Sequence, residues 1–273
     1  MEVRFVNHED KGIDLNTDEV ILQYHEFFDY SWDSCIKNNK ILDFTRNTAT
    51  IPITVAVVPE TQERYFEILE ELYQITESDI LSKQMGRLYV GGGYMQCYIS
   101  GVKKIDIYNN IPLQIQHLTI VTDYPFWMKE KKYSYRKYDG TPEQYEYLDY
   151  NYDYNYDLTP RSAAEYLLNE HYAACSFKMV IYGPVESPRI EIKGHLYEIV
   201  TTLTDYEYVV LDSRNRTIYQ VNRLGGVKNI YNSQNKESYV FEKIPAGRNL
   251  VNWNRKFGFD ITLYEERSEP AWT

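Results

Sequence analysis

Near its C-terminus the chain reads Phe257-Gly258-Phe259-Asp260-Ile261-Thr262-Leu263-Tyr264, with an apolar side chain at every second position. This alternation is the period of a β-strand that has one buried face. A Pro-Ala-Gly turn at 245–247 precedes the stretch, and a charged tail ending in Trp272 follows it. We therefore expect the closing strand of a β domain, with the C-terminal tail docked on the protein rather than frayed.

Further short apolar segments, separated by turns, precede this strand in the C-terminal half of the chain. They are 177–182, 189–193, 196–203, 206–211, 217–221 and 239–243. Short strands at such spacing predict an antiparallel β-sandwich. A short amphipathic helix is expected just before them, with Thr159 as its N-cap, Pro160 as its first residue, and Leu167 and Leu168 on its apolar face.

The N-terminal half predicts one longer helix among strands. From Glu60 to about Ile75, apolar residues recur at the helical spacing of three and four positions. Pro59 and acidic residues at the start suit a helix N-terminus. A β-hairpin is expected where Gly91, Gly92 and Gly93 separate the apolar segments 86–90 and 94–99.

Other strands are expected at 51–57, 105–107 and 113–121. In the last of these the apolar alternation shifts by one position, which predicts a β-bulge near Gln116 and His117. The segment 124–127 is expected to end the regular pattern.

Between the two halves, 133–157 is dominated by Tyr and acidic residues, and we interpret it as a linker or a surface insertion. Asp149, Asn151 and Asp153 begin like an EF-hand calcium loop. Tyr154 and Pro160 stand where that loop needs Gly and Glu, so no metal site is expected.

Composition excludes several classes of protein. The chain has 273 residues and a net charge of −11, which argues against a nucleic-acid-binding protein. No signal peptide or membrane-spanning apolar run is visible, so synthesis in a cytoplasm and no membrane partner are expected. The three cysteines are far apart and favour buried free thiols. The 28 tyrosines are weak support for an interaction protein.

The sequence contains no motif that identifies an enzyme. It lacks a G-x-S-x-G elbow and a nucleotide-binding P-loop, and its five histidines are scattered. We therefore expect no enzymatic activity, no catalytic residue, no cofactor and no metal.

Several stretches in order resemble the distal tail proteins of long-tailed phages. They are the 60–75 helix with Asp79, the segments 86–90 and 94–98, the strand that ends in 124–127, the β-rich half with 190–192, 210–212 and 241–249, and the tail 266–272. The resemblance covers most of the chain.

This resemblance implies a mostly β fold with minor α content. Residues 1–132 would form a ring-forming β-sandwich with a helix and a hairpin, 133–162 a linker or insertion, and 163–273 a galectin-like β-sandwich. Six copies would form a homohexameric ring. It would join the tail tube protein to the tail-tip (tail-associated) protein in the virion, support receptor-binding proteins in many phages, and let DNA pass without recognising its sequence.

One alternative stays open, a carbohydrate-binding module for attachment to the host cell wall. That module would need an exposed aromatic platform, which Trp253 or the tyrosines of 145–156 could supply. For the ring, the expected interface residues are in the hairpin and before the second half. They are Gly86, Arg87, Leu88, Tyr89, Tyr124, Pro125, Phe126 and Trp127.

Overall fold

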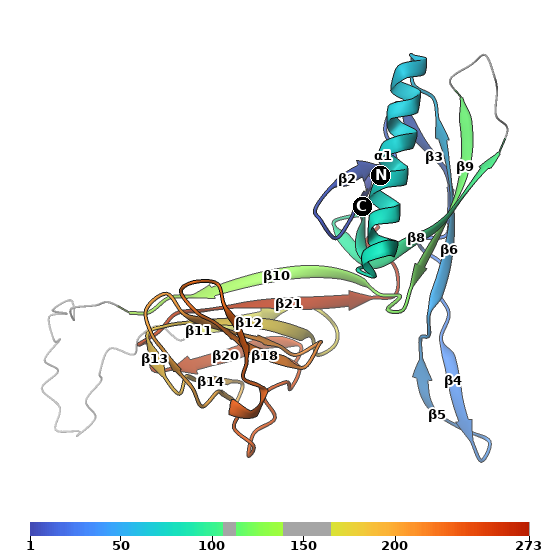
Figure 1. Ribbon diagram of the computed structural model, residues 1–273. Helices are drawn as coiled ribbons and strands as arrows, with labels where there is room; N and C mark the ends of the chain where they lie inside the picture. The colour runs from blue at the N-terminus through green and yellow to red at the C-terminus, as the bar shows by residue number, and fades with distance from the viewer. Residues whose placement is uncertain (106–112, 139–164, 273) are drawn as a thin grey trace, which may run out of the picture. The chain divides into compact units, whose positions relative to one another are not determined.

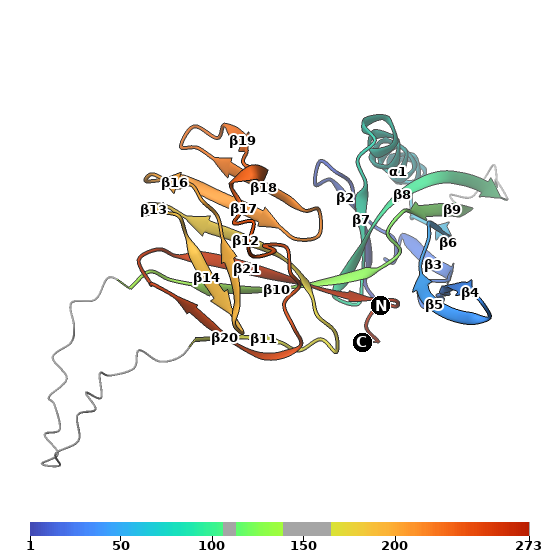
Figure 2. The same cartoon turned by 90° about the horizontal axis from the view of Figure 1, so that it is seen from below.

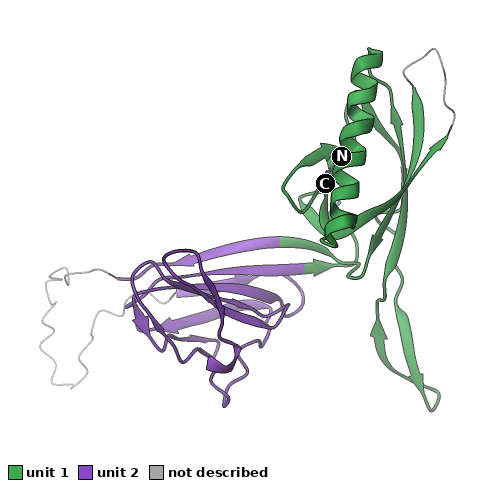
Figure 3. Ribbon diagram, in the orientation of Figure 1, with its two compact units in different colours: residues 1–129, 266–273 green, residues 130–265 purple. Residues whose placement is uncertain are grey.

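The computed structural model describes residues 1–105, 113–138 and 165–272. Contacts divide the chain into two compact units (Figure 3). Unit 1 comprises 1–129 and 266–273, and unit 2 comprises 130–265. The chain enters unit 2 along strand β10 (Trp127–Tyr135) and returns along β21 (Phe259–Arg267). The expected class, mostly β with minor α, is confirmed.

Unit 1 is a β-sandwich with one long helix packed on it (Figure 1). Its strands are β1 (Val3–Val6), β2 (Gly12–Asp14), β3 (Val20–His25), β4 (Asp33–Lys37), β5 (Lys40–Thr45), β6 (Ala49–Val57), β7 (Gly86–Val90), β8 (Gly93–Ile105) and β9 (Gln114–Thr122). The long β8 belongs to both layers: its first half pairs with β7, and its second half pairs with β9. The expected hairpin at 86–99 is therefore confirmed as the start of β8 and its partner β7.

Helix α1 (Gln62–Ser82) is confirmed and extends seven residues beyond the expected end at Ile75. Thr61 caps it, because its hydroxyl accepts the backbone N–H of Arg64 at 3.2 Å. Ile68, Leu72 and Ile75 are buried in the core of unit 1. Each contributes about 1.5–3 kcal/mol through the burial of its side chain.

The bulge predicted in the strand 113–121 is wrong. β9 pairs with β6 residue for residue from Gln114 to Thr122, and its buried face continues through Gln116 and Leu118. The apolar pattern shifts because buried amides take two core positions, where Gln116 Nε2 donates to Gln114 Oε1 at 3.0 Å. The register irregularity lies instead in β8, between Ile99 and Gly101.

Unit 2 is a second β-sandwich (Figure 2). Its strands are β11 (Glu165–Asn169), β12 (Ser176–Tyr182), β13 (Val185–Glu186), β14 (Arg189–Ile192), β15 (His195–Glu198), β16 (Thr202–Leu203), β17 (Tyr208–Asp212), β18 (Thr217–Val221), β19 (Val227–Asn229) and β20 (Gly247–Trp253), with one 3-10 turn, η1 (Tyr231–Ser233). One layer contains β19-β18-β17-β12-β21-β10 and the other β11-β20-β14-β15.

The expected closing strand 257–264 is confirmed as β21. Phe259, Ile261 and Leu263 are fully buried between the layers, as their alternation predicts. β21 pairs with β12 in antiparallel register. The tail that follows belongs to unit 1, where the Trp272 ring stacks on Phe28 with centroids 4.0 Å apart, although Trp272 remains 72% exposed.

Three expectations about local structure in or near unit 2 are wrong. The helix expected after Pro160 is not found in the described residues, where Glu165–Asn169 form strand β11 with Leu167 and Asn169 buried. The segment 239–243 is a turn region rather than a strand, and β20 at 247–253 was not expected. The regular pattern does not end at 124–127 either, because β10 begins at Trp127.

Several expectations fall on residues outside the described ranges. They concern the end of the strand expected at 105–107, the expected helix cap Thr159, and the part of the Tyr-rich stretch at 139–157. The ranges 1–132, 133–162 and 163–273 remain predictions as domains, since the compact units divide at 129/130 and 265/266. No helix in the described parts of the chain is long and apolar enough to span a membrane.

Candidate interaction surfaces

The first expected interface segment, on β7, has an inner and an outer face. Gly86 and Leu88 are buried in unit 1, whereas Arg87 is exposed and Tyr89 is half-buried. Successive side chains of a strand point to opposite faces, so only Arg87 and Tyr89 can meet a partner. An interface role for these two residues remains a proposal, and Gly86 and Leu88 have packing roles.

Gly86 is required by the buried carboxylate of Asp79 on α1. A Cβ at position 86 would lie 2.5 Å from Asp79 Oδ2 and 2.6 Å from Phe5 Cζ. Asp79 is fully buried, and its Oδ1 accepts the His8 backbone N–H at 2.9 Å and lies 2.6 Å from His8 Nδ1. These contacts join α1, β7 and the residues after β1.

The outer face of the β7–β8 hairpin carries a small patch of one cation and two phenols. The Arg87 guanidinium lies 5.8 Å from the Tyr94 ring centroid, and Arg87 Nη1 lies 3.9 Å from Asp10 Oδ1. The Tyr89 and Tyr94 rings are 5.6 Å apart. Arg and Tyr are enriched at protein interfaces, which suits a contact surface here.

The second expected segment, 124–127, is also partly core. Pro125 and Trp127 are buried, and Trp127 meets the Phe27 ring edge-on at 5.9 Å. Tyr124 and Phe126 are half-buried, with ring centroids 4.9 Å apart. The accessible part of this segment is therefore its aromatic pair, whose role as an interface is still a proposal.

Phe126 belongs to an aromatic cluster around Arg46. The Arg46 guanidinium lies 4.9 Å from the Phe126 centroid and 5.8 Å from those of Tyr30 and Trp32. Burial lowers the pKa of Arg46, but the guanidinium stays cationic at neutral pH. Tyr30 and Trp32 are each about half exposed. A half-exposed cluster of Arg and aromatic side chains is typical of a protein-binding surface.

The hairpin β4–β5 is the surface that sequence reasoning missed. All its residues are exposed, and it extends away from the rest of unit 1 (Figure 1). Asn38 and Asn39 form its two-residue turn with φ of 49° and 57°, the left-handed values of a type I′ turn. The two adjacent Asn residues between short apolar runs were the signal that could have revealed it.

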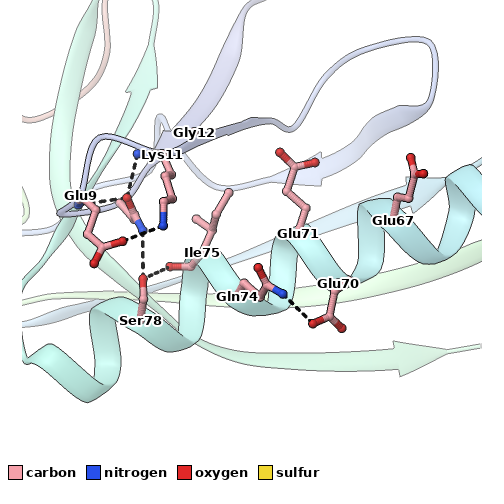
Figure 4. Close-up of a pocket in the computed structure, with 10 residues that line it drawn as sticks. Glu9, Lys11, Gly12, Glu67, Glu70, Glu71, Gln74, Ile75 and Ser78 are labelled. Carbon is pink, nitrogen blue, oxygen red and sulfur yellow. Dashed lines mark hydrogen bonds and ion pairs between the residues drawn. The ribbon is translucent and has the colours of Figure 1, made fainter.

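An acidic groove follows one side of α1 (Figure 4). It has a volume of about 450 Å³, and Glu67, Glu70 and Glu71 of α1 line it. Across the groove, Lys11 Nζ pairs with Glu9 Oε2 at 2.9 Å, and this ion pair lowers the pKa of Glu9. Excess negative charge suits a basic partner segment. The described residues contain no group of three or more metal-ligating side chains.

In unit 2 the Trp253 ring, one of the two places expected for an aromatic platform, packs against core side chains. It packs edge-on against Phe259 at 5.2 Å and Tyr135 at 5.6 Å, and its Nε1 donates to the Phe257 carbonyl at 3.1 Å. The indole is partly buried and packs against the core of unit 2, so a carbohydrate-binding role for it stays a prediction. The tyrosines of 145–156 lie outside the described residues.

Solved structures of phage hub and baseplate proteins are similar to this chain. The Dit protein of phage SPP1, described as a paradigm of the hub adsorption apparatus in phages that infect Gram-positive bacteria, matches with a TM-score of 0.59 at 8% identity, over 97% of this chain and 99% of that one. Chains of the phage P2 baseplate in its activated conformation, with Ca and with Sr, match with TM-scores of 0.60 and 0.61 at 14% identity, over 98% of this chain and 99% of theirs. No family model and no curated protein matches the sequence.

The chain has the fold of phage hub and baseplate proteins. The resemblance drawn from the sequence is thus confirmed at the level of the fold. The match includes both units, so the hub fold accounts for the whole architecture rather than for one sandwich. Within this hub fold, the exposed surfaces described for unit 1 include the Arg87 patch, the Arg46 cluster, the β4–β5 hairpin and α1.

Proposed function

We propose that this chain is a structural protein of a phage tail and forms a ring at the distal end of the tail. The ring joins the tail tube protein to the tail-tip protein and supports receptor-binding proteins. It acts by geometry and has no enzymatic activity or cofactor. Its place of action is the virion, after synthesis in the cytoplasm of the bacterial host.

The observation that carries this proposal is the match of the whole chain to hub and baseplate proteins over 97–98% of its length. A match restricted to one sandwich would fit many unrelated functions, because sandwich folds are reused widely. A match that includes both sandwiches and α1 in one chain is far more specific than a match to a single sandwich.

The unlike exposed surfaces of unit 1 support a ring. A closed ring of identical subunits needs two different patches on each copy, which meet head to tail. The described surface of unit 1 offers several distinct patches. The net charge of −11 fits a ring around DNA, because negatively charged walls do not retain the duplex.

The test is the mass of the purified protein in solution over a concentration series, with negative-stain images of the same samples. We expect six-fold rings whose fraction rises with concentration. Immuno-gold labelling of intact virions then should mark the distal end of the tail. Label on the capsid, or no label on purified virions, would overturn the proposal whatever the solution mass.

A further inference from the structure

The hairpin β4–β5 carries an apolar face that nothing in the described part of its own chain covers. Ile36 pairs across the strands with Ile41, and Phe44 pairs with Ser34 on the same face. Ile36, Ile41 and Phe44 are 64%, 57% and 53% exposed. A lone two-stranded hairpin is at best marginally stable in water, and an exposed apolar face marks a contact surface.

The end of this hairpin is basic. Lys37 pairs directly with Lys40 next to the turn, and neither forms an ion pair with any residue that the structure describes. Like charges directly opposite each other destabilise a strand pair. Carboxylates of a partner would remove that repulsion, so the hairpin end suits an acidic surface.

The outer face of α1 has the matching pattern. Phe66, Tyr73 and Ile80 recur at intervals of seven residues and are 57%, 58% and 40% exposed. Residues seven apart lie almost above one another on a helix, so the three form one apolar stripe. Its length is about 21 Å at 1.5 Å per residue. Hairpin strands of five and six residues are about 17–20 Å long, which is nearly the same.

Acidic side chains follow the stripe. Glu63, Glu70 and Glu77 repeat with the same interval of seven and lie beside the apolar residues, and Glu67 lies next to them toward the acidic groove of Figure 4. The helix thus presents an apolar stripe with an acidic border. The hairpin presents an apolar face with a basic end.

We propose that the β4–β5 hairpin of one copy docks on the α1 stripe of the neighbouring copy, with Lys37 and Lys40 against the acidic border. This contact rests on the proposed ring and names the two patches that build it. Both surfaces are exposed within unit 1 of a single chain, so they meet only between chains. Because they are unlike, the contact is head to tail, which is the kind of contact that a closed ring of identical subunits requires.

The partner that covers the hairpin is a second copy of this chain, because the chain itself carries the complementary charges. Copies with a net charge of −11 repel one another, so self-assembly needs local attraction between unlike charges. The two lysines and the glutamate row supply it within the same sequence. A different tail protein on the hairpin is the competing outcome of the test.

The test reverses the charges on each side separately and then together. Lys37→Glu with Lys40→Glu, or Glu67→Lys with Glu70→Lys, should raise the concentration needed for ring assembly about a hundredfold or more. The chain with all four substitutions should assemble again, since the attraction is restored with opposite signs. The control is Lys103→Glu with Lys104→Glu, on the exposed end of β8. It changes the net charge by as much as the reversal of Lys37 and Lys40 and should leave assembly unchanged.

A second measurement detects the contact itself. Ser34 lies on the apolar face of the hairpin, whereas the exposed natural thiol, Cys35, points to the opposite face, so the thiol is moved to the docking face by Ser34→Cys together with Cys35→Ser. With Glu70→Cys on α1, a short bis-maleimide should link rings into covalent ladders up to the full ring. The wild type and Asp18→Cys should give no ladder.

The outcomes separate the two proposals. Rings that persist with the lysines reversed, or a quadruple variant that stays dissociated, would overturn the docking while leaving the hub proposal intact. The absence of ladders in Glu70→Cys samples that form rings would do the same. A wild type that does not assemble at millimolar concentration overturns the docking, whereas labelling of virions decides the hub proposal independently.

Discussion

Two hairpins of unit 1 have similar local signals and opposite environments. In β7–β8, Leu88 is fully buried and Gly86 contacts the buried Asp79. In β4–β5, Leu42 is 62% exposed, and no residue of the hairpin is buried. The first hairpin is stabilised by the core of its own unit. The second has no core of its own, so its apolar residues are available to a partner.

The largest expected difference is in thiol reactivity. Cys97 lies in β8 opposite Gly86 and is fully buried, which raises its pKa well above the usual range, whereas Cys35 on β4 is exposed. A thiolate is the reactive form. At mildly alkaline pH, Cys35 should react with a maleimide at least about a thousandfold faster, because Cys97 reacts only through rare unfolding. Peptide mass spectrometry after timed quenching measures both rates. Equal rates in the native protein, or slow labelling of Cys97 in denaturant, would contradict this interpretation.

The next largest difference is expected in stability, when one leucine in each hairpin is truncated to alanine. Leu88→Ala should lower the free energy of unfolding by about 2–5 kcal/mol, because it leaves a cavity in the core. Leu42→Ala should change it by less than about 0.5 kcal/mol, since the side chain is already solvated. Urea unfolding of dilute monomer, followed by tryptophan fluorescence, measures both. A large loss in Leu42→Ala would mean that the hairpin packs on its own chain.

Gly86→Ala should lower the free energy of unfolding by about 1–3 kcal/mol, because its Cβ would overlap buried atoms. The nearest of these, Asp79 Oδ2, is 2.5 Å from the position that the new Cβ would take. Gly101→Ala is the matched control within β8, where the nearest atom is 3.7 Å away, and it should be neutral or slightly stabilising. Thermal unfolding of the two variants side by side tests the pair. Equal melting temperatures would remove the packing role assigned to Gly86.

The smallest effect is expected in the turn of β4–β5. Asn39→Gly favours the type I′ turn, yet the hairpin contributes little to the stability of unit 1, so the free energy of unfolding should move by less than about 0.5 kcal/mol. Backbone amides of β4 and β5 should exchange with solvent more slowly in this variant and faster than those of β7 in both proteins. Hydrogen exchange with mass spectrometry measures both. If the β4 amides of the monomer were as well protected from exchange as those of β7, the β4–β5 hairpin would not be the less stable of the two.

Three of the failures of the sequence-based predictions share one cause. β9, β11 and β20 each bury an amide side chain at a position where the pattern requires an apolar residue: Gln116, Asn169 and Asn249. Asn249 Nδ2 donates to the Pro245 and Gly247 carbonyls at 2.9 Å, and Asn169 Nδ2 donates to the Ile244 carbonyl at 3.0 Å. A buried amide is tolerated where backbone carbonyls satisfy it. The Ile244 carbonyl is 75 residues away from Asn169 in the sequence. The carbonyls that Asn249 meets are only four and two residues away, but no alternation of apolar residues marks them.

The candidate interface was predicted in part. The alternation in β7 indicated a strand but not which of its two faces meets the core. In the structure Gly86 and Leu88 face the core, and Arg87 and Tyr89 face outward. The Arg46 cluster brings Tyr30, Trp32 and Phe126 together across a long separation in sequence. No periodic pattern in the sequence could have predicted that these side chains pack together.

The sequence by itself determined the β class, the helix α1 and the closing strand β21. Their signals are periods of two and 3.6 residues, which follow from backbone geometry and need no knowledge of neighbours. Only the tertiary structure decided which apolar residues are covered. Leu88 and Leu42 have the same side chain in similar hairpins, and one is in the core while the other is in solvent. Burial depends on what the rest of the chain brings against each strand, and that is a property of the whole fold.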